Sequence, residues 1–588
     1  RIFRYNDMKK FKLQLDKFTG PMYVRLWTPA MISALGWALS DMADAVVVGQ
    51  KLGTVGLAAI SLILPIYMIN CAIAHGFGIG GSARFSHILA QGKDDDAKKN
   101  FSSVVLVSTL LSVLTAILGI VLIKPLLAFL GTVPADGELF SATKSYLVVL
   151  LASTPLFYLS NILNYYLRND EEEKIAGIGS VTGNLLDIAC NITFVLVFGL
   201  GTFGAALSTA IGQIVSISIY SVALFKKNNH LSFVRINKRT VSYAFSCFKS
   251  GAASSVKYLY QMAFFLICNN VLIRISGESG VAVFDLIQNT SYLILYLYEG
   301  TSRAMQPLVS TYQGEHNLIG KKSIRKIGFA SGILVGTLLI LAIQIEPVWI
   351  CMLFGVTEAE TIAIAEIALR IFTLGAFFGG INIMLANYYE SSESEKAAFI
   401  IETMRGAALL LPFTALFSFI GDIVLFWWLF PATEILCFVI FLLCRNKFKI
   451  PGLAKERVFQ TTIQGNEETI NNASISVGEF CENWGCDLKR QYIMTLTIEE
   501  IAMAILVHGL KNVKNGYIQI TVLAFENGEF EIHLRDNAVT FNPFSLEKEE
   551  KLENNEDFTA VGVDIIRKKA TLFHYRRYQG FNAQIVRL

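Results

Sequence analysis

The sequence predicts an all-α polytopic membrane protein with twelve transmembrane helices in two six-helix pseudo-repeats, followed by a small cytosolic α+β sandwich domain. Three observations predict this fold class. Of the 588 residues, 53% are hydrophobic and only 16% are charged, against about 25% charged residues in soluble domains. Twelve apolar stretches reach the roughly 20 residues that a helix needs to cross a bilayer. The charged fraction then rises after Pro451.

This rise in charge marks a second, soluble part of the chain. Residues 451–588 contain 34 charged residues in 138, or 25%, whereas the first 450 residues contain 63, or 14%. The composition therefore predicts a membrane body that carries a soluble tail. The net charge of +3 is too small to indicate a nucleic-acid partner. The nine Cys residues show no metal-binding spacing, so we expect no resident metal. We also expect that no cofactor is required.

The apolar stretches divide into two sets of six. The expected spans of the first half are 25–48, 55–79, 103–130, 143–166, 175–198 and 203–225. Those of the second half are 249–273, 281–302, 327–350, 363–388, 399–420 and 424–444. The predicted parts are an N-terminal cytosolic segment (1–24), an N-lobe (25–230), a C-lobe (231–446), a connector (447–457) and a tail domain (458–588).

The two halves repeat in sequence. Asn164-Tyr165-Tyr166 recurs as Asn387-Tyr388-Tyr389, and the pattern of Glu171 to Lys174 recurs in Glu393 to Lys396. Because each repeat contains an even number of spans, both halves have the same orientation. A pseudo-twofold axis along the membrane normal then relates them.

Loop charges predict how the spans are oriented. With the span ends given above, the N-terminal segment and the loops after even-numbered spans contain 23 Lys and Arg residues, against two in the loops after odd-numbered spans. By the positive-inside rule, both termini are cytoplasmic. The tail is therefore expected where ATP and cytosolic proteins are present.

Polar residues within the first-half spans mark a candidate coupling site. Asp41 and Asp44 share one face of span 1, while Asp187 and Asn191 share one face of span 5, with Asn184 nearby. An ionisable residue in a span costs about 2.5–3.5 kcal/mol on insertion scales and usually faces a cavity. Together these residues could bind a cation or a proton. Alternatively, the two span-1 carboxylates lie at the membrane interface, and Asn191 makes a hydrogen bond between helices.

The second half offers a separate polar set. Asp285 is the clearest carboxylate in its spans, and Asn269, Asn270, Gln288 and Asn289 accompany it. We expect these five residues to line the second-half wall of a transport cavity. The alternative for Asp285 is that it pairs with a neighbouring amide.

Several passages resemble the multidrug and toxic compound extrusion transporters. They are Asp44 to Gly53, Gly76 to Ser82, Gln91-Gly92, Gly204 to Leu207, and Gln306-Pro307-Leu308 leading to Gln313-Gly314. The resemblance covers residues 20–446 and includes the twelve spans. It implies a V-shaped bacterial inner-membrane antiporter that exports drugs or other xenobiotics, typically small amphipathic or cationic molecules, against an inward flow of H+ or Na+.

The resemblance also implies residue roles. In this family a span-1 aspartate and a span-5 Asn/Asp pair form a cation site, and Asp44 stands at the span-1 position. The usual order in span 5 is Asn followed by Asp, whereas here Asp187 precedes Asn191. The pair is present but swapped, which leaves the choice between H+ and Na+ open.

The tail shows an α+β pattern. A hairpin signal at Asn527-Gly528 joins two alternating stretches. The expected elements are a strand at 458–463, helices at 469–484 and 490–509, strands at 517–525 and 529–536, a helix at 559–570 and a hairpin around Gly580.

This pattern resembles the histidine-kinase-type ATPase fold, in particular the bacterial anti-sigma-factor kinases. Glu500 matches the catalytic Glu, but Ala504 replaces the Mg²⁺-binding Asn. Asp536 matches the adenine-binding Asp, and Gly562 retains one glycine of the phosphate-binding segment. The resemblance implies a degenerate domain. ATP binding stays open, and ATPase or kinase activity is not expected.

Three functions remain in competition. The first is a cation-coupled efflux antiporter whose tail is regulatory and could bind a cytosolic protein. The second is a flippase for lipid-linked precursors, which needs a cationic cavity, whereas only Lys257, Arg370 and Arg405 lie well inside the spans. The third is a membrane sensor kinase, which needs a phosphoacceptor His that the connector lacks.

Overall fold

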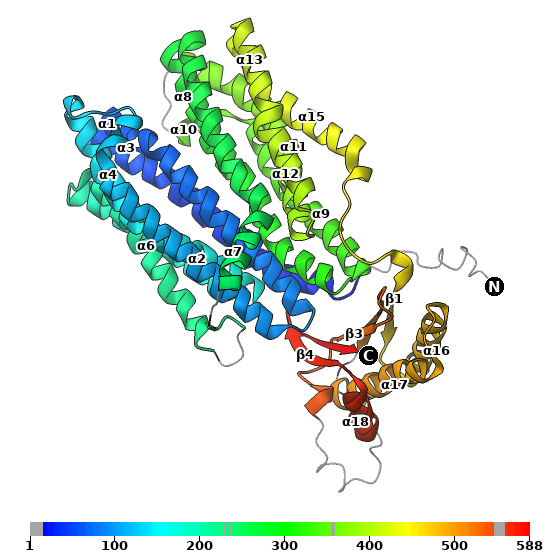
Figure 1. Ribbon diagram of the computed structural model, residues 1–588. Helices are drawn as coiled ribbons and strands as arrows, with labels where there is room; N and C mark the ends of the chain where they lie inside the picture. Colours follow the sequence, from blue (N-terminus) through cyan, green and yellow to red (C-terminus); the bar gives the residue numbers. More distant parts are fainter. Residues whose placement is uncertain are drawn as a thin grey trace.

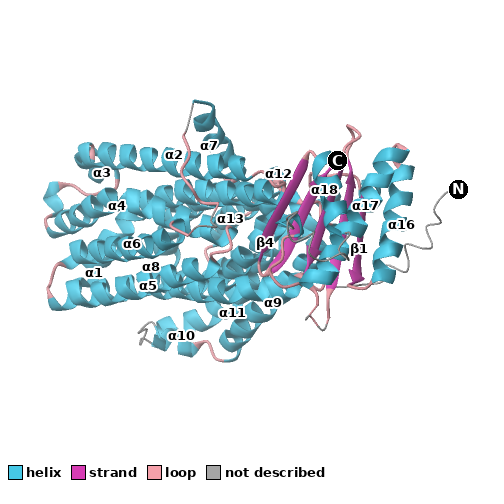
Figure 2. Ribbon diagram, turned by 90° about the horizontal axis from the view of Figure 1, so that it is seen from below, coloured by secondary structure: helices cyan, strands magenta, loops and turns pink. Residues whose placement is uncertain are grey.

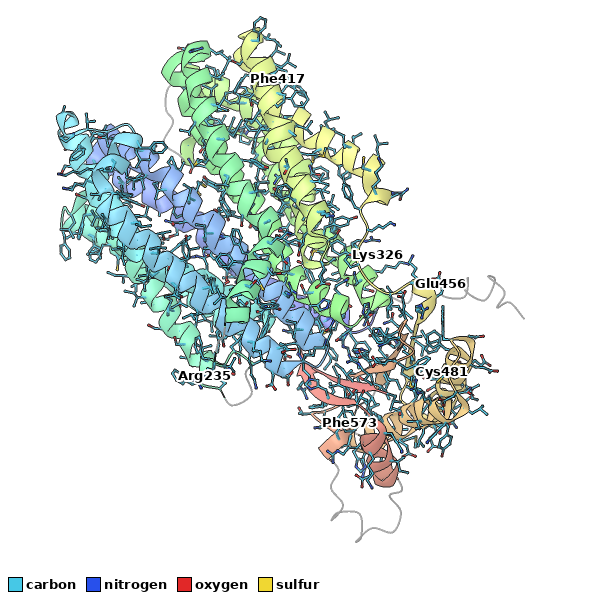
Figure 3. The ribbon with its side chains drawn as sticks, in the orientation of Figure 1. Arg235, Lys326, Phe417, Glu456, Cys481 and Phe573 are labelled. Atoms are coloured by element: carbon cyan, nitrogen blue, oxygen red, sulfur yellow. The ribbon has the colours of Figure 1, made fainter. Side chains whose placement is uncertain are left out.

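The computed structural model describes residues 16–226, 230–235, 238–353, 359–511, 513, 515–545 and 559–588. Long helices form a bundle, and a small sheet domain lies at one end of it (Figure 1). We call the end of the bundle nearest the sheet the tail end. Lys326 lies near the tail end, whereas Phe417 lies near the opposite end (Figure 3).

The first helical run, α1 (Thr19–Ala90), contains the first two expected spans. A straight helix of 72 residues would be about 108 Å long, far more than the thickness of a membrane. Instead, both of its ends lie beside the C-terminal end of one other helix, the helix that contains Tyr312 and Gly314. Thr19 Oγ1 is 2.8 Å from Tyr312 OH, and a methyl group added at Gly314 would lie 2.6 Å from His87 O. The run therefore folds back on itself as two antiparallel spans.

The first half continues through helices that match the expected spans 3 to 6. Their bounds are α2 (Asp94–Val121), the short α3 (Ile123–Phe129), α4 (Glu138–Asn169), α5 (Glu173–Asn191) and α6 (Gly201–Leu224). A π-helical segment, Ile192–Val197, extends α5. On α2, the exposed side chains of Leu110, Leu114, Ile117 and Val121 form one stripe. Such a stripe suits the lipid-facing side of a membrane helix.

The second half begins with α7 (Lys238–Ser250) and α8 (Ala252–Gly314). α8 is a second hairpin, because the rings of Phe264 and Phe284 are 6.0 Å apart and Lys257 Nζ is 2.9 Å from Glu299 Oε1. The later helices are α9 (Leu318–Ile345), α10 (Val348–Leu353), α11 (Ala359–Ser391), α12 (Glu395–Thr403), a π-helical segment (Met404–Ala408), α13 (Leu410–Ile420), α14 (Ile423–Trp427) and α15 (Leu429–Cys444).

The halves repeat in structure where they repeat in sequence. Each expected span falls mainly on helical segments of the corresponding half, although the third, seventh, ninth, eleventh and twelfth spans cross short breaks between segments. Glu171 and Glu393, at matching positions of the repeat, both have positive φ, 67° and 60°. Such values are uncommon for residues other than glycine. The same tight turn therefore joins α4 to α5 and α11 to α12, as expected for two six-span pseudo-repeats.

The tail domain is an antiparallel sheet covered by helices on one side (Figure 2). Its strands follow the order β1-β2-β3-β5-β4. Asn466 and Asp487 cap the first two helices through their side-chain oxygens. The elements are β1 (Val458–Gln464), α16 (Glu467–Asn483), α17 (Leu488–Ala504), β2 (Tyr517–Ala524), β3 (Phe530–Asp536), α18 (Thr559–Lys569), β4 (Leu572–Tyr578) and β5 (Phe581–Arg587).

By length and hydropathy, ten helical segments in the described part of the chain could cross a membrane. Nine of them belong to the bundle. The tenth, Leu488–Gly509, lies in the tail, where Met494, Ile498 and Ile501 are fully buried in the core beneath the sheet. Its apolar side chains are therefore explained by the tail core rather than by lipid.

The two halves pack directly against each other at the tail end. Gln306 Nε2 of α8 donates a hydrogen bond to Ser82 Oγ of α1 at 3.1 Å. The same two helices approach so closely that a methyl group at Gly314 would lie 2.8 Å from Ala90 Cβ. The bundle is therefore closed at this end.

Gly80 is one of the residues at which the two halves approach most closely. A methyl group there would overlap the Cys247 carbonyl oxygen and lie 2.5 Å from Gly251 N. We expect Gly80→Ala to destabilise the folded, closed protein by about 1–3 kcal/mol, because two backbones would have to separate. Thermal melting of the purified protein measures this. Gly20→Ala is the control, since nothing lies within 4 Å of the added methyl. Equal melting of the two variants would contradict the packing described.

Candidate functional site

A cavity of about 530 Å³ lies between the two halves. Its first-half lining includes Trp37, Ser40, Tyr67, Met68, His75, Asn161, Asn184 and Asp187. Its second-half lining includes Lys257, Tyr258, Gln288, Tyr292, Glu299, Arg303, Glu402, Arg405 and Glu434. A cavity of this size, with aromatic and polar walls, suits a drug-sized molecule.

Asp187 is the carboxylate of the first-half wall. It lies in α5 and is only 7% exposed. Its Oδ2 accepts a hydrogen bond from Ser40 Oγ at 3.1 Å. Its Oδ1 has no donor in hydrogen-bonding geometry among the described residues, although the hydroxyls of Ser208 and Thr209 lie nearby. A buried carboxylate oxygen without a donor favours the binding of a proton or a cation.

Asn184, one helical turn before Asp187, also contacts span 1. With its amide oxygen turned toward Trp37, Asn184 accepts a hydrogen bond from Trp37 Nε1 at 3.3 Å. The structure therefore brings span 1 and span 5 together at Trp37 and Ser40. Position 44 lies one turn beyond Ser40 on the same helix face. The side chains of Asp41 and Asp44 lie outside the described residues, so their roles stay predictions.

The other predicted lining residues fall in different places. Gln288 lines the cavity, whereas Asn289 is half-buried in α8 and does not belong to the lining. Asn191 is fully buried in α5, also outside the lining. It shares a helix with Asp187 but not the cavity wall, because α5 continues past the cavity. The side chains of Asn269, Asn270 and Asp285 lie outside the described residues.

A buried ionic cluster, which we call the Glu299 cluster, forms part of the second-half wall. It consists of Glu299, Lys257 and Arg303. Glu299 Oε1 lies 2.9 Å from Lys257 Nζ and 3.5 Å from Arg303 Nη2. The Arg303 guanidinium stacks over the Trp37 ring at 3.9 Å from its centroid, a cation–π contact between the halves. This cluster carries one net positive charge.

A second ionic cluster, the Arg405 cluster, carries the opposite charge. Arg405 Nη2 lies 2.8 Å from Glu434 Oε1, and Arg405 Nη1 lies 3.4 Å from Glu402 Oε2. Asn382 Nδ2 donates to Glu434 Oε2 at 2.8 Å. The two clusters together carry three cations and three carboxylates, so their charges cancel.

The sequence interpretation did not name Glu299, Glu402 or Glu434 as lining residues. It counted Arg303 among the loop charges, because the eighth span was expected to end at residue 302; the structure instead places Arg303 in the cavity wall. The sequence spacing of these charged residues could have indicated the clusters. Glu299 precedes Arg303 by four positions and Glu402 precedes Arg405 by three, which puts each pair on one helix face.

The three predicted nucleotide-binding residues of the tail have structural partners. Asp536 is fully buried, and its oxygens accept hydrogen bonds from Ala538 N, Asn582 Nδ2 and Gln584 Nε2 at 2.7–2.9 Å. Burial raises the pKa of this carboxyl. These hydrogen bonds take up three of the about four acceptor positions of the carboxylate.

Glu500 and Gly562 lie against each other, because a methyl group at Gly562 would overlap the Glu500 carboxyl. Burial, followed by the neighbouring Glu499, raises the pKa of Glu500. The structure therefore brings the predicted catalytic Glu next to the retained glycine of α18, while Asp536 lies on the sheet.

Comparison with known proteins places the bundle in context. The family model described as MatE matches residues 29–193 and 253–416, one segment in each half. The multidrug export protein MepA of Staphylococcus haemolyticus is 25% identical over 453 residues, covering 75% of this chain and 94% of that protein. MepA of Staphylococcus aureus is 25% identical over 431 residues, covering 70% of this chain and 89% of that protein.

Solved structures share the fold of the bundle. A multidrug resistance transporter of the MOP superfamily in an outward-facing conformation matches with a TM-score of 0.66 and 22% identity, covering 74% of this chain and 99% of that chain. A Pyrococcus furiosus transporter of the same superfamily matches with a TM-score of 0.64 and 23% identity, covering 74% of this chain and 99% of that chain. That transporter has been described as having a binding pocket of reverse polarity, which suggests a different function for it.

Proposed function

This chain belongs to the multidrug and toxic compound extrusion family, and from that premise we propose that it is a cation-coupled antiporter exporting small amphipathic or cationic xenobiotics. It is a multi-pass membrane transporter and not an enzyme. The observation that carries the proposal is the cavity between the halves, with the buried carboxylate of Asp187 in its wall.

The proposed mechanism is alternating access. The N-lobe (25–230) and the C-lobe (231–446) rock about the cavity, as in other transporters built from repeats. Binding of H+ or Na+ at Asp187, with Asp44 as the predicted second carboxylate, favours one state. Substrate favours the other. Coupling then follows from the different affinities of the two states for each ligand.

We propose a bacterial plasma membrane as the location, with both termini in the cytoplasm. The excess of Lys and Arg in the loops after even-numbered spans supports this orientation. Those loops lie at the tail end, so the tail end would be cytoplasmic and the cavity closed to the cytoplasm.

The flippase alternative remains second, because the cavity is not cationic. Among the described lining residues, the Lys and Arg side chains are Lys257, Arg303 and Arg405, and they are outnumbered by the carboxylates of Asp187, Glu299, Glu402 and Glu434. Arg370, which the sequence also places well inside a span, pairs with Glu366 at 2.9 Å and does not line the cavity. A lipid-linked diphosphate would meet no excess of positive charge here.

For the tail we propose regulation without catalysis. Its α+β order supports the kinship with histidine-kinase-type ATPases predicted from the sequence. Ala504 lacks the oxygen that Mg²⁺ needs at that position, and Asp536 already accepts hydrogen bonds from Ala538 N, Asn582 Nδ2 and Gln584 Nε2 of the tail itself.

Competition between coupling ion and substrate tests the proposed function. We expect the affinity of the purified protein for a fluorescent cationic dye to fall by about ten-fold when H+ or Na+ is raised to saturation, since the ligands favour opposite states. Fluorescence titration measures the affinity, with K+ as the control ion. Dye affinity that is the same under all three conditions would contradict coupling.

A further inference from the structure

The tail sheet has one face toward its own helices and the other toward the tail end of the bundle (Figures 1 and 2). In β3, Ile532 and Leu534 belong to the tail core, whereas the alternate residue Arg535 contacts the bundle. Although they are polar, Gln519 and Arg535 are only 2% and 4% exposed. A polar sheet face ordinarily contacts water. Here it is an intramolecular docking surface.

This surface binds the second half of the bundle at the turn between α8 and α9. Arg535 Nη2 donates to both carboxylate oxygens of Glu315, at 2.6 and 2.7 Å. Asn317 Nδ2 donates to Gln519 Oε1 at 2.8 Å, and Gln460 Nε2 donates to Asn317 Oδ1 at 2.7 Å. Three adjacent strands, β1, β2 and β3, therefore contact one turn.

The same sheet binds the first half through the turn between β4 and β5. Gln579 N donates to Glu171 Oε2 at 3.1 Å, and Gln579 Nε2 donates to Glu173 Oε2 at 3.2 Å. Arg25 Nη1 donates to Gln579 O at 2.7 Å. Arg576 Nε lies 3.7 Å from Glu171 Oε1. One rigid sheet thus contacts the α4–α5 turn and the start of α1 as well as the α8–α9 turn.

We propose that the docked tail is an intramolecular clamp, which holds the two halves together at the tail end and stabilises the state whose cavity is closed there. The proposal rests on the alternating-access mechanism given above. For the cavity to open at the tail end, the α4–α5 turn must move away from the α8–α9 turn. The tail must then dissociate from one of these two turns. Release of the tail is therefore coupled to the change of state.

The chemistry of the interface fits reversible docking. Many of its contacts are charge-assisted and amide hydrogen bonds, which water can replace when the surfaces separate. Apolar contacts accompany them, such as Phe18 against Phe581, whose ring centroids are 5.3 Å apart. Arg535 Nη1 and Arg576 Nη2 have no hydrogen-bond partner among the described residues. A permanent interface would be expected to satisfy such donors.

Hydrogen–deuterium exchange of the full-length purified chain tests the clamp without requiring transport. Two groups of peptides report separate events. Those covering 313–319 and 171–174 report docking, and those covering 76–82 and 247–255 report contact between the halves. The variants are Arg535→Ala on the tail, Glu315→Ala on the bundle, and the double variant. Arg490→Ala, at an exposed arginine of the tail paired with Asp487, is the matched control.

We expect exchange in both groups of peptides to rise about ten-fold or more in either single variant, since each leaves an unpaired buried charge. We expect the exchange rates of the double variant to be no higher than those of the single variants. The control variant should exchange at the wild-type rate. Glu315→Ala leaves the tail sequence intact, so an unfolded tail cannot explain the result. Faster exchange at 313–319 with unchanged exchange at 76–82 would overturn the clamp. Failure of gradient-driven transport with the expected exchange pattern would overturn the proposed function alone.

Discussion

Replacing Asp187 by Asn is expected to abolish gradient-driven efflux in a protein that still folds. Asn has nearly the volume of Asp and can still accept the hydrogen bond from Ser40 Oγ, which is 3.1 Å from Asp187 Oδ2. It has no charge to exchange for a proton or Na+, so we expect coupled efflux to fall by about ten-fold or more. Dye efflux from cells under imposed H+ and Na+ gradients, measured separately, gives the result.

The control for this variant is Asp422→Asn. Asp422 caps α14 by accepting a hydrogen bond from Leu425 N at 2.9 Å, on the exposed surface. Asn is an equally good cap, so efflux should stay at the wild-type level. Asp44→Asn is expected to behave like Asp187→Asn. Normal coupled efflux in both of these variants would move the coupling site toward Asp285 in the second half.

Replacing Glu299 by Gln is expected to cause a large loss of stability. Glu299 is the carboxylate shared by Lys257 and Arg303 in the Glu299 cluster. The side chains of these two cations are only 18% and 8% exposed. Removing the shared charge leaves both inside the protein, which typically costs about 3–5 kcal/mol. The midpoint of thermal unfolding in detergent measures the change.

A matched pair elsewhere in the spans provides the control. Glu366 and Arg370 are also four positions apart on one helix and lie 2.9 Å apart, but their side chains are 41% and 43% exposed. The protein does not enclose either charge, so Glu366→Gln should lower the melting temperature less than Glu299→Gln does. Equal melting of the Glu299 and Glu366 variants would contradict the burial of the Glu299 cluster.

Most of the fold could be predicted from the sequence, because the bilayer imposes a strict length and polarity on each span. The apolar stretches, the repeat at Glu171 and Glu393, and the strands and helices of the tail all follow from local patterns. The structure adds the antiparallel pairing within α1 and within α8. Hydropathy locates the break between the two spans of each run. It does not show how the chain turns there, because both runs stay helical through the turn.

The site was only partly predictable. Asp187 and Asn184 stand out as polar residues in an apolar span. The Glu299 and Arg405 clusters do not, because the stability of each charge depends on a partner whose position only tertiary packing decides. Glu434, for example, reaches Arg405 from a different span.

The docking surface of the tail was not predictable either. Alternation in β3 marks Ile532 and Leu534 as core residues and makes Arg535 resemble a residue that faces water. Nothing local to β3 indicates that Glu315, 220 positions away, accepts its hydrogen bonds. Burial of a polar sheet face depends on how the tail is placed against the bundle, which hydropathy does not encode.

Counterflow in liposomes tests the central claim most directly. The purified chain is reconstituted, a cationic dye is placed on one side, and an H+ or a Na+ gradient is imposed while dye and ion movements are recorded together. The account predicts that dye moves against its own gradient, that the coupling ion moves in the opposite direction, and that Asp187→Asn abolishes both movements. Dye movement at the same rate without any gradient, unchanged in Asp187→Asn, would contradict it.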